Sequence, residues 1–264
     1  MTAKEAIRQL GLPDKPVCIH ASLRSFGQPP KGLLEAFLDS NCTILVPSFT
    51  DMFEAPPVSR WMPEQNGAGD YSYFHQKTYC NCGCYIPATN ALTIEEMGTF
   101  PKLVLAHPDR VRGNHCLNSF TALGTDAQVL VQAQTNDDVY APLRNLYALD
   151  GYVLLIGTDL RTATAIHYAE TLSGRKPFIR WSRDAEGETI PVRAGGCSEG
   201  FERLAPLLAP YEQQATVGCS LWRCWRVRDL VDVCVNAIRQ NPEITHCGDP
   251  ECDRCNDAIK GGPK

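Results

Sequence analysis

Apolar and polar residues follow one another along the chain in blocks that predict short strands separated by helices. Residues 17–21 and "CTILVPSFT" (42–50) are apolar runs typical of buried strands, and "GLLEAFL" (32–38) between them is helix-like. Strand, loop, helix and strand within this length form a βαβ unit, whose two strands are parallel. A third apolar run, "DGYVLLIGTDL" (150–160), predicts another buried strand. The predicted fold class is therefore α/β.

The remaining segments are assigned from periodicity and turn residues. Residues 51–90 are rich in Pro, Gly, Asn and aromatic residues, and a loop this long is typically a lid or a binding wall. No linker or repeat divides residues 1–264, so one domain is expected. An N-terminal helix is expected, with Thr2 and Glu5 as a capping box and Gly11 as its end. A partly helical segment at 93–108, a strand at 118–124 and a helix at 125–133 are also expected. A hairpin around "DAEGE" (184–188) leads into a helix, and a final helix is expected at 227–240.

A titratable pair follows the strand predicted within residues 150–160. In "TATAIHYAETLSGR" (162–175), the three-residue spacing of His167 and Glu170 places both side chains on one face of a helix. Open α/β sheets bind ligands where their strands end. The pair is therefore a candidate catalytic base with its helper, and the alternative is an amphipathic segment with a satisfied histidine. The expected helix ends are an N-cap at Thr162 or Thr164 and a terminator at Gly174.

Composition and charge exclude some classes of protein. The 264 residues carry 25 basic and 30 acidic side chains, for a formal net charge of -5. Nucleic-acid binding needs a strong basic patch and is not expected, whereas a cationic small substrate would fit the acidic balance. No run of eighteen apolar residues is present, so no membrane span is expected. Because the first residues form an amphipathic helix rather than a signal sequence, a cytoplasmic protein is predicted.

The loop "IHASLRSFG" (19–27) connects the first strand of the βαβ unit to its helix. A loop in this position exposes backbone N–H groups at a helix N-terminus, where the helix dipole favours anions. Arg24 adds a positive charge suited to a pyrophosphate. The loop is therefore a candidate phosphate site, and an ordinary polar βα turn is the alternative.

Five sequence blocks resemble, in the same order, those of the aminoglycoside 3-N-acetyltransferase family. The first, "HASLRSFG", is similar to the family's "H-S-S-L-R-S-F-G", and the matches run from about residue 18 to residue 233. Two departures bear on the expected substrate preference: Cys116 replaces a proline after His115, and "VYAPL" lacks the Gly and Ser before Pro-Leu. The other four blocks are "RGNHCLNSFTALG", "YAPLRNLYALDGYVLLIG", "TATAIHYAE" and "VGCSLWRCWRVRDLVD".

The resemblance implies a single three-layer α/β/α domain with a central, mostly parallel sheet. It also implies an enzyme that transfers acetyl from acetyl-coenzyme A to an amine, which in the drug-modifying members lies on the 2-deoxystreptamine ring of an aminoglycoside. The expected partners are coenzyme A and a cationic amine, and the expected assembly is a monomer or a homodimer. The residues that the resemblance assigns to the coenzyme site are His20, Ser22, Leu23, Arg24, Ser25, Phe26, Gly27, Ser119 and Thr164.

The family match also favours a catalytic role for His167. Only the free base of an amine attacks a thioester, and histidine is the side chain whose unperturbed pKa suits a base at neutral pH. We expect His167 to accept the proton and Glu170 to orient the imidazole or attract the cationic substrate, without an acyl-enzyme. A polycationic substrate also requires carboxylates around its pocket. The candidates are Asp51, Glu54, Asp70, Asp137 and Asp138, with solvated loop acids as the alternative.

The tail "THCGDPECDRCNDA" (245–258) holds three of the thirteen cysteines. Cys252 and Cys255 form a Cys-x-x-Cys knuckle near Cys247, and tetrahedral zinc needs a fourth ligand. The resemblance to one branch of the family implies Cys197, so that zinc would tie residues 246–264 to the hairpin region. Alternatives are a ligand from Cys80, Cys82, Cys84 or His246, and reduced cysteines without metal. The cysteines expected to be reduced core residues include Cys18, Cys42 and Cys234.

The function predicted from the sequence is acetyl-coenzyme A-dependent N3-acetylation of aminoglycosides, with a structural zinc. One alternative is the same chemistry on another small amine, for which only the loop 51–90 would differ. A second alternative is a zinc-bearing scaffold protein without turnover. The presence of both His167 and the "SLRSFG" loop argues against the scaffold.

Overall fold

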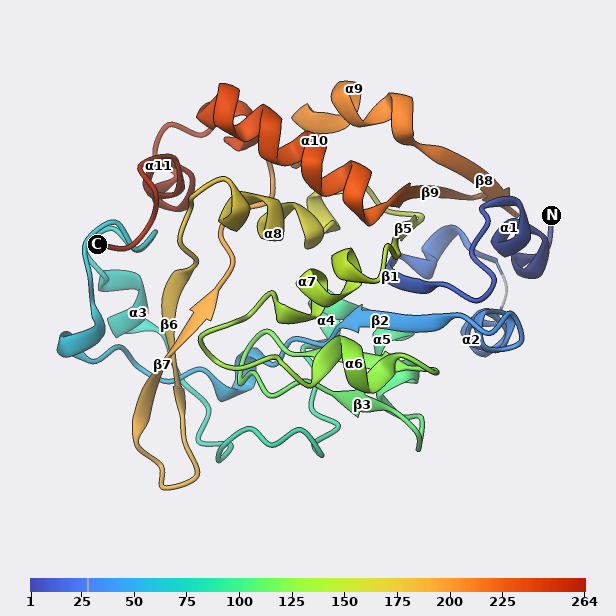
Figure 1. Cartoon of the computed structure of the whole chain (residues 1–264). Coiled ribbons are helices and arrows are strands. Elements are labelled where there is room, and N and C mark those ends of the chain that lie inside the picture. Colours follow the sequence, from blue (N-terminus) through green and yellow to red (C-terminus); the bar gives the residue numbers. More distant parts are fainter. Residues whose placement is uncertain (28) are drawn as a thin grey trace.

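The computed structural model describes residues 1–27 and 29–264, and a seven-stranded β-sheet forms its centre (Figure 1). The strand order in this sheet is β3-β4-β2-β1-β5-β9-β8. Its strands are β1 (Pro16–Ala21), β2 (Thr43–Pro47), β3 (Val111–Arg112), β4 (Phe120–Leu123), β5 (Tyr152–Ile156), β8 (Gln213–Val217) and β9 (Ser220–Arg226).

The direction of the strands confirms the mostly parallel sheet, although parallel hydrogen bonding is limited to its centre. The strand β1 pairs in parallel with β2 and with β5. The outer pairs β2–β4, β4–β3, β5–β9 and β9–β8 are antiparallel, so β4 and β9 run against the other strands. The hairpin β8–β9 was not predicted, because the exposed polar residues of β8 hide the alternation of a strand.

Helices cover both faces of the sheet and make the three layers that the sequence predicts. Alternate residues of β5 point to opposite faces: Val153 and Leu155 pack into one apolar core, and Leu154 and Ile156 into the other. The first face is covered by α6 (Ala127–Val131), α7 (Ala141–Ala148), α8 (Ala165–Leu172) and α10 (Val227–Gln240). The second face is covered by α1 (Ala3–Gln9), α2 (Pro30–Leu38) and α5 (Thr99–Leu105).

Side-chain caps were predicted at the N-termini of α1 and α8. The capping box of α1 is present: Thr2 Oγ1 accepts from the Glu5 amide at 3.3 Å, and Glu5 Oε2 accepts from the Thr2 amide at 2.7 Å. The expected side-chain cap of α8 is wrong, since Thr164 occupies the N-cap position but makes no capping hydrogen bond. The Thr164 side chain lines a pocket instead.

The hairpin β6 (Phe178–Arg183) and β7 (Thr189–Ala194) forms a second sheet, as predicted around residues 184–188. Beside it lie the loop 63–70 and the tail helix α11 (Asp253–Ile259); Gly67 N donates to Asp257 Oδ2 at 2.9 Å. No helix in the described parts of the chain is both long and apolar enough to cross a membrane. That residues 1–264 form one domain stays a prediction. The remaining short helices are α3 (Ser72–Gln76), α4 (Ile94–Met97) and α9 (Ala205–Leu208).

Candidate active site

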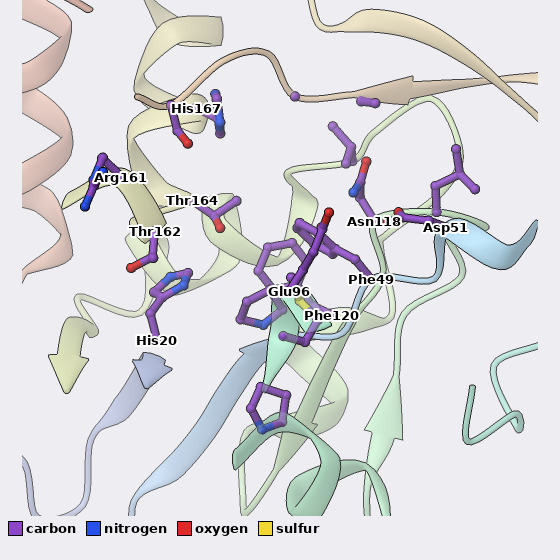
Figure 2. A pocket seen from close by; sticks show the side chains of 18 of the residues that line it. His20, Phe49, Asp51, Glu96, Asn118, Phe120, Arg161, Thr162, Thr164 and His167 are labelled. Carbon is purple, nitrogen blue, oxygen red and sulfur yellow. The ribbon is translucent and has the colours of Figure 1, made fainter. Parts of the chain in front are cut away.

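A pocket of about 530 Å³ lies at the carboxyl ends of β1 and β2 and at the start of α8. This is the edge of the sheet at which parallel strands place ligand sites. Figure 2 shows His20, Thr164 and His167 on one side of the pocket and Asp51 and Asn118 on the other. The lining residues come from segments 19–22, 47–54, 96–101, 117–120, 139–140, 158–167 and 194–198, together with Lys77, Arg180 and Arg254.

His167 and Glu170 form a hydrogen-bonded pair at this pocket. Nδ1 of His167 lies 2.7 Å from Oε2 of Glu170, and the His167 side chain is 12% exposed. Because an ionised carboxylate only accepts hydrogen bonds, Nδ1 carries the hydrogen in this contact, and in a neutral imidazole the lone pair is then on Nε2. The pair was predicted from its spacing on α8, and His167 lines the pocket. That the pair is catalytic stays a prediction.

Aromatic rings and one glycine hold the His167 imidazole in place. The ring of Phe201 meets it edge-on with centroids 4.8 Å apart, and the Tyr140 ring lies parallel to it at 6.2 Å. A Cβ atom on Gly195 would lie 2.7 Å from the Tyr140 hydroxyl and 3.4 Å from Nε2 of His167. The chain therefore passes close to the imidazole only because residue 195 has no side chain.

The predicted coenzyme loop borders a second cleft that adjoins the pocket. Leu23–Ser25 form a single 3-10 turn, and Ser22, Leu23, Arg24 and Gly27 line a cleft of about 700 Å³. The pocket and this cleft share four lining residues: Ala21, Ser22, Glu96 and Met97. The cleft at the Ser-Leu-Arg loop therefore adjoins the pocket that His167 lines.

Three residues assigned to the coenzyme site line neither cavity: Phe26, Ser119 and Ser25. Phe26 is 1% exposed and stacks on Trp222, with ring centroids 6.4 Å apart, so its side chain belongs to the core. Ser119 is fully buried; its hydroxyl donates to the Ser48 carbonyl at 2.8 Å and accepts from Nε of Arg112 at 3.0 Å. Ser119 thus belongs to a polar cluster beneath the pocket, between the lining residues Asn118 and Phe120.

Thr164 and His20 line the pocket, whereas Ser25 does not. Thr164 lines the pocket beside His167. The Ser25 hydroxyl faces the turn after β5, where a Cβ atom on Gly157 would lie 3.0 Å from it. His20 lines the pocket at the end of β1, and burial lowers its pKa to about 4, so its ring is neutral and offers no charge to a phosphate.

Both acidic and basic side chains line the pocket. Of the carboxylates predicted there, Asp51 and Glu54 line the pocket, whereas Asp70, Asp137 and Asp138 do not. Glu96 was not predicted, because nothing in the sequence separates it from an ordinary acid on a short helix. The basic lining residues are Lys77, which pairs with Glu54, Arg161, which pairs with Asp159, and Arg180 and Arg254.

Replacing Asp51 with Asn is expected to stabilise the free protein at neutral pH. Partial burial, with Glu96 and Glu54 nearby, raises the pKa of Asp51 from 3.8 to about 6, so the fold binds this proton more tightly than the unfolded chain. The resulting penalty is absent below about pH 4, grows until about pH 6 and is complete above it. Urea unfolding should therefore show a gain for Asp51→Asn at pH 8 that vanishes near pH 4. An equal gain at both pH values would contradict the raised pKa.

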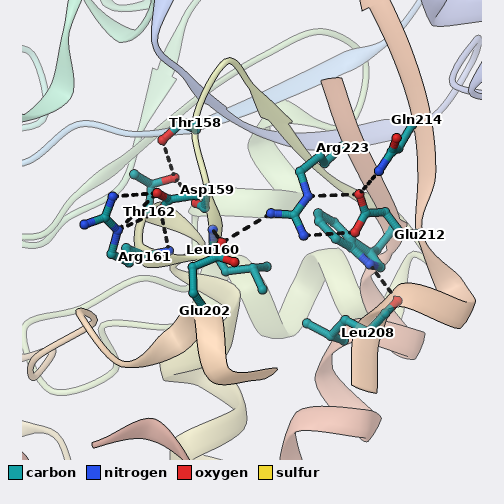
Figure 3. A network of polar contacts seen from close by, with 11 residues as sticks. Thr158, Asp159, Leu160, Arg161, Thr162, Glu202, Leu208, Glu212, Gln214 and Arg223 are labelled. Atoms are coloured by element: carbon teal, nitrogen blue, oxygen red, sulfur yellow. Dashed lines mark hydrogen bonds and ion pairs between the residues drawn. The ribbon is translucent and has the colours of Figure 1, made fainter. Parts of the chain in front are cut away.

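A polar network holds the rim of the pocket after β5 (Figure 3). Arg161 makes an ion pair with Asp159 at 2.6 Å, and the Leu160 amide donates to Oε1 of Glu202 at 2.6 Å. Arg223 on β9 binds both Glu202, at 3.2 Å, and Glu212, at 2.9 Å. The lining residues Thr158, Arg161 and Thr162 were not predicted, although the polar "TDLRT" directly after a buried strand was a usable signal.

Four cysteines meet at the C-terminal tail. The sulfurs of Cys197, Cys247, Cys252 and Cys255 all lie within 4.8 Å of one another, and the Cys247 amide donates to Sγ of Cys255 at 3.4 Å. In a tetrahedral zinc site with Zn–S bonds of about 2.3 Å, the sulfurs would be about 3.8 Å apart. Spacing and donor type therefore fit a zinc ion.

The other cysteines divide into a bonded pair and free thiols. Cys80 and Cys82 are bonded to each other in an exposed loop, and neither belongs to the cluster of Cys197, Cys247, Cys252 and Cys255. The alternative ligand His246 instead has Nε2 3.2 Å from Oδ1 of Asn256. As predicted, Cys18, Cys42 and Cys234 are free and buried.

Known structures share this fold. The crystal structure of the apoenzyme of aminoglycoside acetyltransferase AAC(3)-IVa matches with a TM-score of 0.75 at 22% identity, over 98% of this chain and 95% of that chain. The YokD protein from Bacillus subtilis matches with a TM-score of 0.70 at 23% identity, over 91% and 100% of the two chains. The fold class is thus the one predicted, a three-layer acetyltransferase fold.

Sequence similarity assigns the family. The family model described as aminoglycoside 3-N-acetyltransferase matches residues 18–239. The chain belongs to the aminoglycoside 3-N-acetyltransferase family. Aminoglycoside N(3)-acetyltransferase III of a Salmonella species is 29% identical over 182 residues, which are 67% of this chain and 61% of that protein. Aminoglycoside N(3)-acetyltransferase VII of Streptomyces paromomycinus is 38% identical over 100 residues, 35% of each chain. The aligned parts span less than two thirds of either relative.

Proposed function

We propose that this protein transfers acetyl from acetyl-coenzyme A to an amino group of an aminoglycoside, with His167 as the general base. The observation that carries the proposal is the His167–Glu170 pair at a pocket that adjoins the cleft of the Ser-Leu-Arg loop. Family membership supports the reaction class. A structural neighbour, a mutant of AAC(3)-IVa, was crystallised in complex with a gentamicin, which supports the acceptor class.

The chemistry follows from the geometry of the pair. Glu170 accepts the Nδ1 hydrogen and leaves the Nε2 lone pair of His167 to take a proton from the incoming amine. The amine nitrogen bonds to the thioester carbonyl carbon, the carbon–sulfur bond breaks, and coenzyme A leaves as a thiol after protonation. Transfer is direct, so no cysteine forms an acyl-enzyme. Glu170 also stabilises the imidazolium that forms when His167 gains the proton.

The two adjoining cavities suit the two substrates. Ser22, Leu23, Arg24 and Gly27 bind the pantetheine and phosphates of the coenzyme in the cleft of about 700 Å³. The acceptor occupies the pocket of about 530 Å³, where Asp51 and Glu96 attract its ammonium groups. The thioester lies at the shared border, within reach of His167.

The cysteine cluster holds one structural zinc ion in this proposal. Four thiolate ligands leave no open coordination position, so the metal has no part in the reaction. Its role is to fix residues 246–264 to the segment that follows β7. A cytoplasmic location and a monomeric or dimeric assembly stay predictions.

A second candidate is the same reaction on a different small amine. The pocket carries the basic side chains Lys77, Arg180 and Arg254 beside its carboxylates, and Arg254 has no ion-pair partner among the described residues. These three basic side chains would repel part of a polycation, so the pocket would suit an amine with fewer positive charges. A scaffold without turnover is disfavoured, because His167 lines the pocket and its Nε2 has no hydrogen-bond partner among the described residues.

A panel of amines tests the proposed function. Acetyl-coenzyme A and the purified protein are mixed with 2-deoxystreptamine aminoglycosides, monoamino sugars and simple alkyl amines, and thiol release is followed. The expected result is release with at least one aminoglycoside, and mass spectrometry should place the acetyl group on the 3-amino nitrogen. Release with simple amines alone favours the second candidate, and no release with any amine contradicts both.

Replacing Arg24 with Ala is expected to weaken coenzyme binding without changing the chemical step. Arg24 is exposed in the cleft of the Ser-Leu-Arg loop, where its guanidinium can pair with phosphate oxygens. The Kd of acetyl-coenzyme A, measured by calorimetry, should rise about ten-fold, as expected for the loss of a charge-assisted hydrogen bond. Arg8→Ala on α1 is the control, because Arg8 is also exposed but lines neither cavity. An unchanged Kd for Arg24→Ala would remove the loop from the coenzyme site.

A further inference from the structure

The cysteine cluster is linked to the His167–Glu170 pair along two separate paths. The first path is the segment 195–200, which begins against the imidazole at Gly195 and continues to Cys197. The same segment then crosses the tail at Gly200, where a Cβ atom would lie only 2.3 Å from the Thr245 carbonyl oxygen and 2.4 Å from that of His246. The tail and the segment over the active site are therefore in direct backbone contact.

The second path runs through the other oxygen of Glu170. Nη1 of Arg175 donates both to Glu170 Oε1, at 2.5 Å, and to the Thr245 hydroxyl, at 2.7 Å. The Thr245 hydroxyl lies 3.4 Å from Oε1 and can donate to it. Nη2 of Arg175 donates to the carbonyl of Pro242, at the start of the same tail turn, Pro242–Thr245.

All three side chains of this second path are shielded from water. Glu170 and Arg175 are each 8% exposed and Thr245 is 3% exposed. A buried carboxylate with a single hydrogen bond could rotate about its last torsion, whereas two donors on Oε1 leave Oε2 aimed at Nδ1 of His167. Because Thr245 is two residues from Cys247, the cluster fixes where the tail places this hydroxyl.

We propose that Arg175 and Thr245 are positioning residues for acetyl transfer, through which the C-terminal tail orients Glu170 and so sets the tautomer of His167. The inference rests on the proposed function of His167 as the base. Neither residue touches the proposed substrates; both act through Glu170. Their sequence positions gave no sign of this role, since Thr245 is 75 residues from Glu170.

Thr245→Val tests the proposal, because valine keeps the shape of threonine and removes only the hydroxyl. Arg175 variants are less suitable, since they leave Glu170 as a buried charge without a counter-charge and can unfold the chain. Thr245→Ser restores the hydroxyl. Thr43→Val is the matched control: Thr43 is also buried, and its hydroxyl accepts from the Asp126 amide at 3.1 Å, at the opposite end of the sheet from the pocket. Each variant is compared with wild type for kcat, for both KM values, for zinc content and for the histidine ¹⁵N NMR spectrum.

The expected result for Thr245→Val is a fall in kcat of about ten-fold with both KM values within about two-fold, as for a misoriented base. Zinc content stays unchanged, Thr245→Ser recovers most of the activity, and the ¹⁵N spectrum shows less of the Nδ1–H tautomer of His167. An unchanged kcat, an equal loss in Thr43→Val, or a serine variant as slow as the valine variant overturns the proposal. If wild type acetylates no amine, the proposed function fails by itself; the tautomer comparison then decides the positioning role, and an unchanged tautomer overturns it.

Discussion

The variant His167→Gln is expected to lose acetyl transfer by about 10²- to 10⁴-fold in kcat, the usual contribution of a general base. Glutamine has no basic nitrogen at the position of Nε2, so the protonated amine stays unreactive. The Kd of acetyl-coenzyme A should change by less than about two-fold, because the Ser-Leu-Arg loop lies in the adjoining cleft. Stopped-flow or steady-state thiol release gives kcat, and calorimetry gives the Kd.

A second histidine serves as the control for that variant. His107 lies outside the pocket, where its Nδ1 accepts from the Asp109 amide at 3.2 Å. His107→Gln should keep wild-type kcat. If His167→Gln also keeps it, the assignment of the base is wrong, even though the ring faces the pocket.

Among the changes considered, removal of zinc should lower the free energy of unfolding the most. Purified protein is expected to contain about one zinc per chain by mass spectrometry. A chelator or the variant Cys252→Ser removes the cross-link between the tail and the segment after β7, so the tail detaches and becomes sensitive to proteases. A loss of about 3 kcal/mol would lower Tm by roughly 6–12 °C in a chain of this size.

Cys219→Ser is the matched control for the zinc experiment, because Cys219 is a free, exposed cysteine outside the cluster. Its metal content and Tm should equal those of wild type. A protein purified without zinc and with the same Tm in the presence of a chelator would contradict the metal site. The same result would remove zinc as the anchor of Thr245, but not the direct hydrogen bond between His167 and Glu170.

The parts of the fold that the sequence predicts are those with local signals. The βαβ unit of β1, α2 and β2 appears as apolar runs separated by turn residues, and α10 begins and ends at the residues expected from its periodicity. It was predicted as the last helix of the chain, but the short helix α11 follows it. The hairpin β8–β9 has no such signal. Its outer strand exposes Gln213, Gln214 and Thr216 to solvent, and the pattern of a half-buried strand is lost.

The residues of the candidate site likewise include some with a local sequence signal and others without one. His167 and Glu170 are neighbours on one helix, so their spacing alone indicates a pair. The partners of Glu170 across the fold and the lining residue Glu96 come from distant segments, and only tertiary structure brings them together. The family resemblance identifies whole sequence blocks, and each block contains core residues as well as site residues. The resemblance therefore also pointed to Phe26 and Ser119, whose buried side chains line neither cavity.

The border shared by the two cavities has a consequence for inhibitor design. Ala21, Ser22, Glu96 and Met97 line both hollows, so the two hollows lie side by side. If the coenzyme and the acceptor bind as proposed, a single compound that joins a pantetheine arm to an amino sugar would occupy both hollows together. Once one arm is anchored, the other binds at a high effective concentration, so two weak fragments can combine into a tight inhibitor.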